Sequence, residues 1–92
     1  DLRPAARMRD PLSGRALEIW TTEPCRQMYG AQNMTTNLAA KAAGKTLCPF
    51  AGVALETQHY PDSPNHPEFP STVLRPGETF RSRTEYRFGI SK

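Results

Sequence analysis

The stretch TFRSRTEYRFGIS, residues 79–91, decides the fold class of this chain. Successive side chains of an extended strand point to opposite faces, and residue types in this stretch alternate in the same way. One face carries aromatic and hydroxyl side chains: Phe80, Ser82, Thr84, Tyr86 and Phe88. The other face carries Arg81, Arg83, Glu85 and Arg87. We therefore predict a long antiparallel strand with one packed face and one solvated face, whose charges discourage pairing at a sheet edge.

Residues 3–23 are predicted to form a β-hairpin. The stretches RPAARMR (3–9) and ALEIWTTE (16–23) flank the turn DPLSG (10–14). Asp and Pro favour the start of a turn, and Gly14 can take the positive φ that closes one. Within the second stretch, one face of the strand carries Leu17, Ile19 and Thr21, and the other carries Glu18, Trp20 and Thr22. The turn and the alternation together predict an antiparallel pair.

The remaining segments add short strands and one optional helix. We expect strands within residues 27–33, 52–60 and 71–74, and a turn at RPGE, residues 75–78. NLAAKAAGK, residues 37–45, is the only helix-favouring stretch, with Asn37 as a possible N-cap. A helix of this length is marginal, so an irregular loop is an equal alternative. The predicted fold class is all-β with antiparallel strands.

Composition restricts both the core and the classes of partner. Of the 92 residues, 37% are hydrophobic and nine are proline, so we expect a modest core. The net charge of +3 is dispersed along the chain, which argues against a nucleic-acid partner. No apolar run reaches the roughly 20 residues that cross a bilayer, so we expect no membrane partner. Cys25 and Cys48 lack a CxxC spacing and are interpreted as free thiols, which favours a cytoplasmic protein.

Glu56 introduces a charge in the middle of GVALETQHY, residues 52–60. Strand alternation puts it on one face together with Ala54, Gln58 and Tyr60. His59 falls on the opposite face, so we predict that Glu56 and His59 are not an acid/base pair. Carboxylate and amide groups bind hydroxyls, and an aromatic ring can lie against a sugar's C–H face. The Glu56 face is therefore interpreted either as a site for a sugar or other polar ligand, or as a solvated surface.

The segment after this strand contains a proline at every third position: Pro61, Pro64, Pro67 and Pro70. This spacing matches ligands of SH3-type domains, but such ligands usually lie in disordered, basic surroundings. Here the prolines lie between predicted strands and beside acidic residues, so we predict an ordered wall or lid. A metal site built from His59, Asp62, His66 and Glu68 fits no compact zinc spacing, and we predict no metal site.

Several longer motifs resemble a known family in order and spacing. They are DPLSGRALEIWTTEP (10–24), QMYGAQN (27–33), GVALETQHYPDSPNHPEFPSTVLRPGETF (52–80) and TEYRF (84–88). Together they resemble the C-terminal part of the aldose 1-epimerase (galactose mutarotase) family. The resemblance implies a large mutarotase-type β-sandwich, or supersandwich. Residues 1–92 would be the C-terminal part of a single domain whose N-terminal part is absent from this chain.

The resemblance also implies a function. The family interconverts the α and β anomers of free aldoses such as galactose and glucose, without a cofactor. It implies that Glu56 is the catalytic base and that Gln27 binds substrate. For such a base we expect Glu56 to be partly buried among Ala54 and Leu55. The family's acid is a histidine upstream of its C-terminal part, and neither His59 nor His66 lies in a matching motif. The isolated chain is therefore expected to be inactive and to need the remaining N-terminal part of the same protein.

The alternative is a carbohydrate-binding or structural β-sandwich piece that shares the fold but has no catalytic role. Glu56 within its intact motif favours the enzyme, because a purely structural strand gains nothing from a carboxylate at that position.

Overall fold

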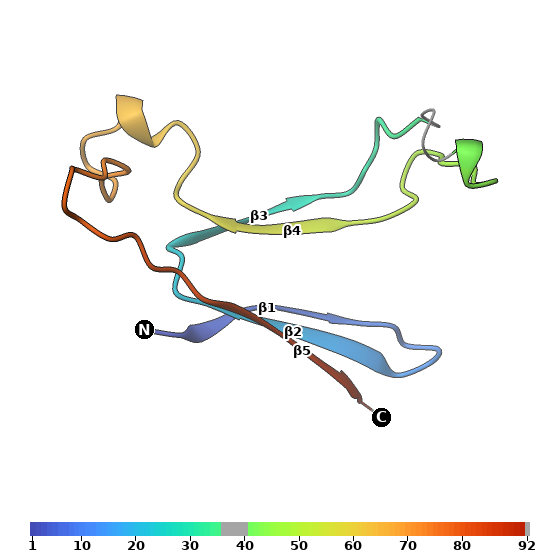
Figure 1. Cartoon of the computed structure of the whole chain (residues 1–92). Coiled ribbons are helices and arrows are strands. Elements are labelled where there is room, and N and C mark those ends of the chain that lie inside the picture. Colours follow the sequence, from blue (N-terminus) through green and yellow to red (C-terminus); the bar gives the residue numbers. More distant parts are fainter. Residues whose placement is uncertain (36–40, 92) are drawn as a thin grey trace. The chain divides into compact units, whose positions relative to one another are not determined.

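The computed structural model describes residues 1–35 and 41–91 (Figure 1). The strands are β1 (Arg3–Arg9), β2 (Arg15–Thr21), β3 (Cys25–Tyr29), β4 (Ala54–Gln58) and β5 (Thr84–Ile90), and a 3₁₀ helix, η1, spans Ser63–Asn65. They form a three-stranded sheet in the order β1-β2-β5 and a two-stranded sheet, β3-β4. The chain divides into two compact units, residues 27–56 and the residues on either side of them. The predicted all-β class is confirmed.

The hairpin of β1 and β2 is antiparallel and ends in the predicted turn. Gly14 has a φ of 77°, and its N–H donates to the carbonyl oxygen of Asp10 at 2.8 Å. The carboxylate of Asp10 accepts the Ser13 hydroxyl at 2.7 Å and the Leu12 N–H at 3.1 Å. These hydrogen bonds, that of the Ser13 hydroxyl most of all, lower the pKa of Asp10. Both turn residues identified from the sequence therefore have the expected roles.

Strand β5 pairs with β2 along its whole length, from Arg15 opposite Ile90 to Thr21 opposite Thr84. Ile19 is the best-buried large side chain of this sheet, at 1% exposure. Its cross-strand partners are Ala6 of β1 and Tyr86 of β5. The predicted inward face of β2 is confirmed at Ile19, which forms the centre of the small core.

The last strand is shorter than predicted, because it begins at Thr84 and not at residue 79. The backbone just before β5 is held differently: the Arg83 N–H donates to the Thr22 hydroxyl oxygen at 3.0 Å, not to a strand carbonyl. The packed face that we predicted for this strand is also wrong for this chain. Tyr86 and Phe88 are 54% and 77% exposed, since no described segment covers them.

Strands β3 and β4 are shorter than the predicted ranges 27–33 and 52–60. The chain runs out along β3 and returns along β4 (Figure 1). Strand β3 stops before Ala31, which is buried and has a φ of 58°, outside the extended region. The Ala31 carbonyl oxygen accepts the N–H of Phe50 at 2.9 Å, which joins the two ends of the connecting segment.

Of the remaining predictions, the RPGE turn is confirmed and the strand at 71–74 is wrong. The Glu78 N–H donates to the Arg75 carbonyl oxygen at 3.0 Å, and Gly77 has a φ of 87°. Residues 71–74 form no strand and are exposed, and the Val73 N–H donates to the Ser71 hydroxyl instead. Residues 37–40 of the predicted helix at 37–45 lie outside the described residues, so the structure does not test this prediction. Among the described helices, none has the length and apolar character to cross a membrane.

Candidate active site

Glu56 occupies the middle of β4, between half-buried neighbours on both sides. Its own side chain is exposed, so the expected partial burial beside Leu55 is wrong for this chain. Within the part of the chain that the structure describes, no hydrogen bond or ion pair engages the Glu56 carboxylate. A strand backbone therefore holds a carboxylate that an outside ligand can reach.

Gln27 lies on β3, the strand that is hydrogen-bonded to β4. Its side chain is exposed, like that of Glu56, and both residues belong to the same compact unit. The two site residues that were predicted from the sequence thus lie on adjacent strands of one sheet. A carboxylate that accepts protons and an amide that both donates and accepts hydrogen bonds suit a ligand rich in hydroxyl groups.

The opposite face of β4 is engaged by other residues. The Thr57 and Thr84 hydroxyl groups hydrogen-bond at 3.0 Å. His59 Nδ1 lies 3.6 Å from Glu23 Oε1, and the His59 ring lies 6.1 Å from that of Phe80, centroid to centroid. The carboxylate partner of His59 is therefore Glu23 and not Glu56, in agreement with the predicted alternation.

The proline segment is ordered around His66. Its Nε2 lies 3.1 Å from Asp62 Oδ2 and its Nδ1 lies 3.1 Å from Glu68 Oε1. The imidazole also stacks on Phe69, with ring centroids 4.8 Å apart. The buried Ser63 donates its hydroxyl to the Tyr60 carbonyl oxygen, which closes the turn before η1. These contacts support the prediction of an ordered wall.

His66 is thus held between two carboxylates and a ring. Among the described residues there is no group of three or more His, Cys, Asp or Glu side chains that could hold a metal ion. Both cysteines, Cys25 and Cys48, are free thiols, as predicted.

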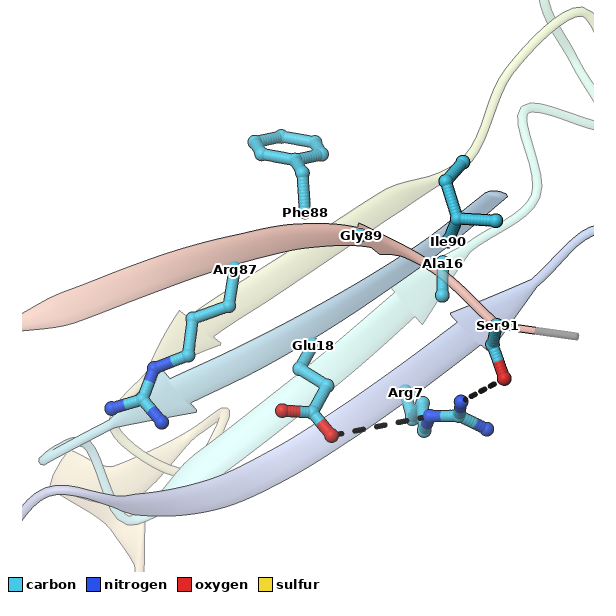
Figure 2. Close-up of a pocket in the computed structure, with 8 residues that line it drawn as sticks. All are labelled: Arg7, Ala16, Glu18, Arg87, Phe88, Gly89, Ile90 and Ser91. Carbon is cyan, nitrogen blue, oxygen red and sulfur yellow. Dashed lines mark hydrogen bonds and ion pairs between the residues drawn. The ribbon is translucent and has the colours of Figure 1, made fainter. Parts of the chain in front are cut away.

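A pocket on the charged face of the three-stranded sheet is a second place where a ligand could bind (Figure 2). Its Arg7 is already engaged: one nitrogen lies 2.9 Å from the Ser91 hydroxyl and another lies 3.9 Å from Glu18. Figure 2 shows Phe88 pointing to the opposite side of the sheet from Glu18 and Arg87. This arrangement is that of a solvated strand face with internal charge pairs, as the alternation predicted.

Arg87 of β5 and Arg83, directly before this strand, are likewise paired. Arg87 donates to Glu85 at 2.8 Å and lies 4.1 Å above the centre of the Trp20 ring. Arg83 forms an ion pair with the same carboxylate. The hydrogen bond from Arg87, together with the charge of Arg83, lowers the pKa of Glu85. Trp20 therefore packs within the sheet surface and is not a free platform for a ligand.

The sequence analysis missed the partners of Thr21 and Glu23, although alternation places Thr21 on the same face as the buried Ile19. The Thr21 hydroxyl bonds to that of Thr84 at 3.0 Å and accepts the N–H of Glu23 at 3.0 Å. No local pattern marks these partners, because they lie in β5 and after β4, far away in the sequence.

Comparisons with known proteins give a consistent result. The family model described as "Aldose 1-epimerase" matches residues 1–87. The mouse galactose mutarotase is 41% identical over 86 residues, which are 94% of this chain and 25% of the mouse protein. The human galactose mutarotase is 38% identical over the same shares. The Escherichia coli aldose 1-epimerase is 42% identical over 77 residues, 78% of this chain and 21% of that protein. The chain thus spans about a quarter of the length of the curated relatives that it matches.

Proposed function

We propose that this chain, which belongs to the aldose 1-epimerase family, forms the C-terminal part of a single mutarotase domain. The complete domain would interconvert the α and β anomers of free hexoses such as galactose and glucose. The observation that carries this proposal is Glu56: an exposed, unengaged carboxylate in the middle of a strand, within the motif that resembles the family's base. Gln27 on the adjacent strand would orient the sugar.

The reaction needs one base and one acid. Glu56 would take the proton from the anomeric O1–H while an acid protonates the ring oxygen, O5. The C1–O5 bond then breaks and the C1–O1 bond becomes a carbonyl double bond. Rotation about C1–C2 exposes the other face of the carbonyl, and O5 attacks C1 again as the proton transfers reverse. Atoms and charges balance, and the product is the other anomer.

The chain supplies the base, and the acid would come from the remaining N-terminal part of the protein. His59 and His66 do not serve as the acid in this proposal, because Glu23, Asp62 and Glu68 engage them. The relatives are about four times as long as the match, which leaves room for such a part.

Exposed apolar side chains also support the proposal that this chain is part of a larger domain. Three large ones follow each other on one face of β5: Tyr86, Phe88 and Ile90, at 54%, 77% and 65% exposure. Soluble proteins rarely leave a contiguous apolar surface of this kind uncovered. We propose that the rest of the same domain covers it. The cytoplasmic location stays a prediction that rests on the free thiols.

The test uses the full-length protein that contains this chain. Glu56→Gln keeps the size of the side chain but removes the base, so the rate of mutarotation of α-glucose, followed by polarimetry, should fall about 10²–10⁴-fold. The fold should be unchanged, because the carboxylate is exposed and forms no hydrogen bond or ion pair with the described residues.

The matched control is Glu18→Gln on the charged face of β2, where an amide oxygen can still accept the Trp20 N–H. It should keep the wild-type rate. If Glu56→Gln kept that rate too, Glu56 would not be the base. If the unmodified full-length protein bound aldoses but did not interconvert their anomers, the non-catalytic carbohydrate-binding alternative would be correct.

A further inference from the structure

The residues that directly follow Glu56 in the chain contact one corner of the compact unit to which they belong. This corner comprises Thr21, Thr22 and Glu23, where the chain leaves β2. Two residues of the strand segment after Glu56, Thr57 and His59, each reach it through a separate set of side-chain contacts. All of these contacts join residues of the same compact unit.

The first link is a chain of hydroxyl groups. Thr57 Oγ1 lies 3.0 Å from Thr84 Oγ1, which itself lies 3.0 Å from Thr21 Oγ1. Thr21 is 1% exposed and its hydroxyl also accepts the Glu23 N–H at 3.0 Å. A threonine hydroxyl has one proton to donate and two lone pairs, so Thr84 can satisfy both neighbours at once. The hydroxyl of Thr57 is thereby connected to a fully buried residue.

The second link is ionic. Glu23 has a side-chain exposure of only 12%, and its Oε1 lies 3.6 Å from His59 Nδ1. The other carboxylate oxygen, Oε2, accepts the Ser82 hydroxyl at 2.9 Å. The carboxylate is thus oriented by Ser82 and cannot swing freely away from His59.

The corner itself is held in place by hydrogen bonds to its backbone groups. The Arg3 guanidinium donates to the carbonyl oxygen of Glu23 at 2.7 Å and to that of Thr21 at 3.4 Å. The Thr22 N–H donates to the Arg83 carbonyl oxygen at 3.0 Å. Arg3 of β1 and Arg83, directly before β5, therefore hold the position from which both links extend.

We propose that Thr57 and His59 are positioning residues for Glu56, held by the corner of Thr21, Thr22 and Glu23 through Thr84 and through the Glu23 carboxylate. The proposal rests on the proposed role of Glu56 as the base. Because Glu56 directly precedes Thr57 in β4, a fixed Thr57 limits how far the strand can shift or twist at Glu56. A proton transfer needs heavy atoms within about 2.6–3.2 Å, so small displacements of the carboxylate reduce the rate of the chemical step.

The central experiment is a pair of variants at Thr57 in the full-length protein. Thr57→Val keeps the shape of the side chain but removes the hydroxyl, and Thr57→Ser keeps the hydroxyl. For Thr57→Val we expect kcat to fall roughly tenfold with KM within about twofold, since a misplacement of about 1 Å can cost about 10²-fold. Thr57→Ser should restore most of kcat. The control is Thr79→Val, at an exposed threonine outside the network, which should match the wild type.

The second link is tested with Glu23→Gln, which removes the charge that faces His59 while the amide oxygen can still accept the Ser82 hydroxyl. We expect Glu23→Gln to lower kcat by a smaller factor than Thr57→Val does. The double variant Thr57→Val/Glu23→Gln should lose more than the product of the two single losses, because each link partly compensates for the other.

Wild-type kcat in Thr57→Val would overturn the proposal, as would an equal loss in Thr57→Val and Thr57→Ser or a loss that appears in KM alone. A fall in the thermal unfolding midpoint that parallels the loss of activity would assign Thr57 to stability and would also overturn it. Glu56→Gln in the same assay separates the two proposals. If Glu56→Gln is inactive and Thr57→Val is unaffected, only the positioning role fails; if Glu56→Gln is active, the base assignment fails and the positioning role fails with it.

Discussion

The two sheets of this chain differ in how far its own residues stabilise them. The three-stranded sheet pairs two strands of seven residues along the full length of a third, and it buries Ile19 at its centre. The two-stranded sheet consists of two strands of five residues, and both predicted site residues on it are exposed. Isolated two-stranded sheets are marginally stable.

The difference indicates a division of roles. The three-stranded sheet and its turns provide stability and the corner of Thr21, Thr22 and Glu23. The two-stranded sheet presents Glu56 and Gln27 with little packing of its own. Sites that hold a reactive group in a fixed place need support from residues that do not touch the substrate. We propose that the contacts of Thr57 and His59 provide that support within this chain.

The largest expected effect is the complete loss of activity when the rest of the protein is removed. The isolated chain of 92 residues should not convert α-glucose faster than buffer does, because in the proposed mechanism it supplies the base without the acid. Polarimetry on equal molar amounts of the isolated chain and the full-length protein checks this. Conversion by the isolated chain at the rate of the enzyme would show that an acid is present within it.

The next effect concerns the stable sheet. Ile19→Ala in the full-length protein should lower the free energy of unfolding by about 2–5 kcal/mol, because it leaves a cavity at a fully buried position. Ile19→Val, the matched control, should cost about 0.5–1.5 kcal/mol. Urea denaturation measures both. A loss below about 1 kcal/mol for Ile19→Ala would mean that the three-stranded sheet does not provide most of the stability of this chain.

A substitution at the predicted site in the two-stranded sheet should have the opposite effect: it should change substrate binding and leave the stability nearly unchanged. Gln27→Ala should raise KM roughly tenfold, the equivalent of about one lost hydrogen bond to substrate. Gln32→Ala, at an exposed glutamine after β3, is the control and should leave KM unchanged. Steady-state kinetics and thermal unfolding distinguish the two effects, and an unchanged KM in Gln27→Ala would remove Gln27 from the site.

The smallest effect is a dependence of stability on pH in the three-stranded sheet. The pKa of Glu85 is lowered in the folded state, chiefly by the hydrogen bond from Arg87. Its contribution to stability is therefore present above the ordinary glutamate pKa of about 4.3 and is lost as the pH falls through the lowered folded-state pKa. The difference in unfolding midpoint between wild type and Glu85→Gln should shrink from pH 6 to pH 3. A constant difference would contradict this.

Local patterns predicted much of this fold. The turn at Asp10–Gly14 and the alternation in β2 depend on neighbours within a few residues, so they can be recognised in the sequence. The strand ends could not be predicted, because they depend on contacts outside the strand: Ala31 stops β3, and Thr22 takes the N–H of Arg83 before β5 begins. The strand predicted at 71–74 failed for the same reason, since no partner strand is available to it among the described residues.

The candidate site likewise has features that the sequence predicts and features that only the tertiary structure shows. The position of Glu56 in a strand, its separation from His59 and the family motif around it all follow from the sequence, because side-chain alternation is a property of any extended strand. The exposure of Glu56 and the partners of Thr57 and His59 became visible only in the tertiary structure. Which residue meets Thr57 depends on how β2, β5 and the end of β4 come together. Such long-range pairing leaves no mark on the residues next to Thr84 or Glu23.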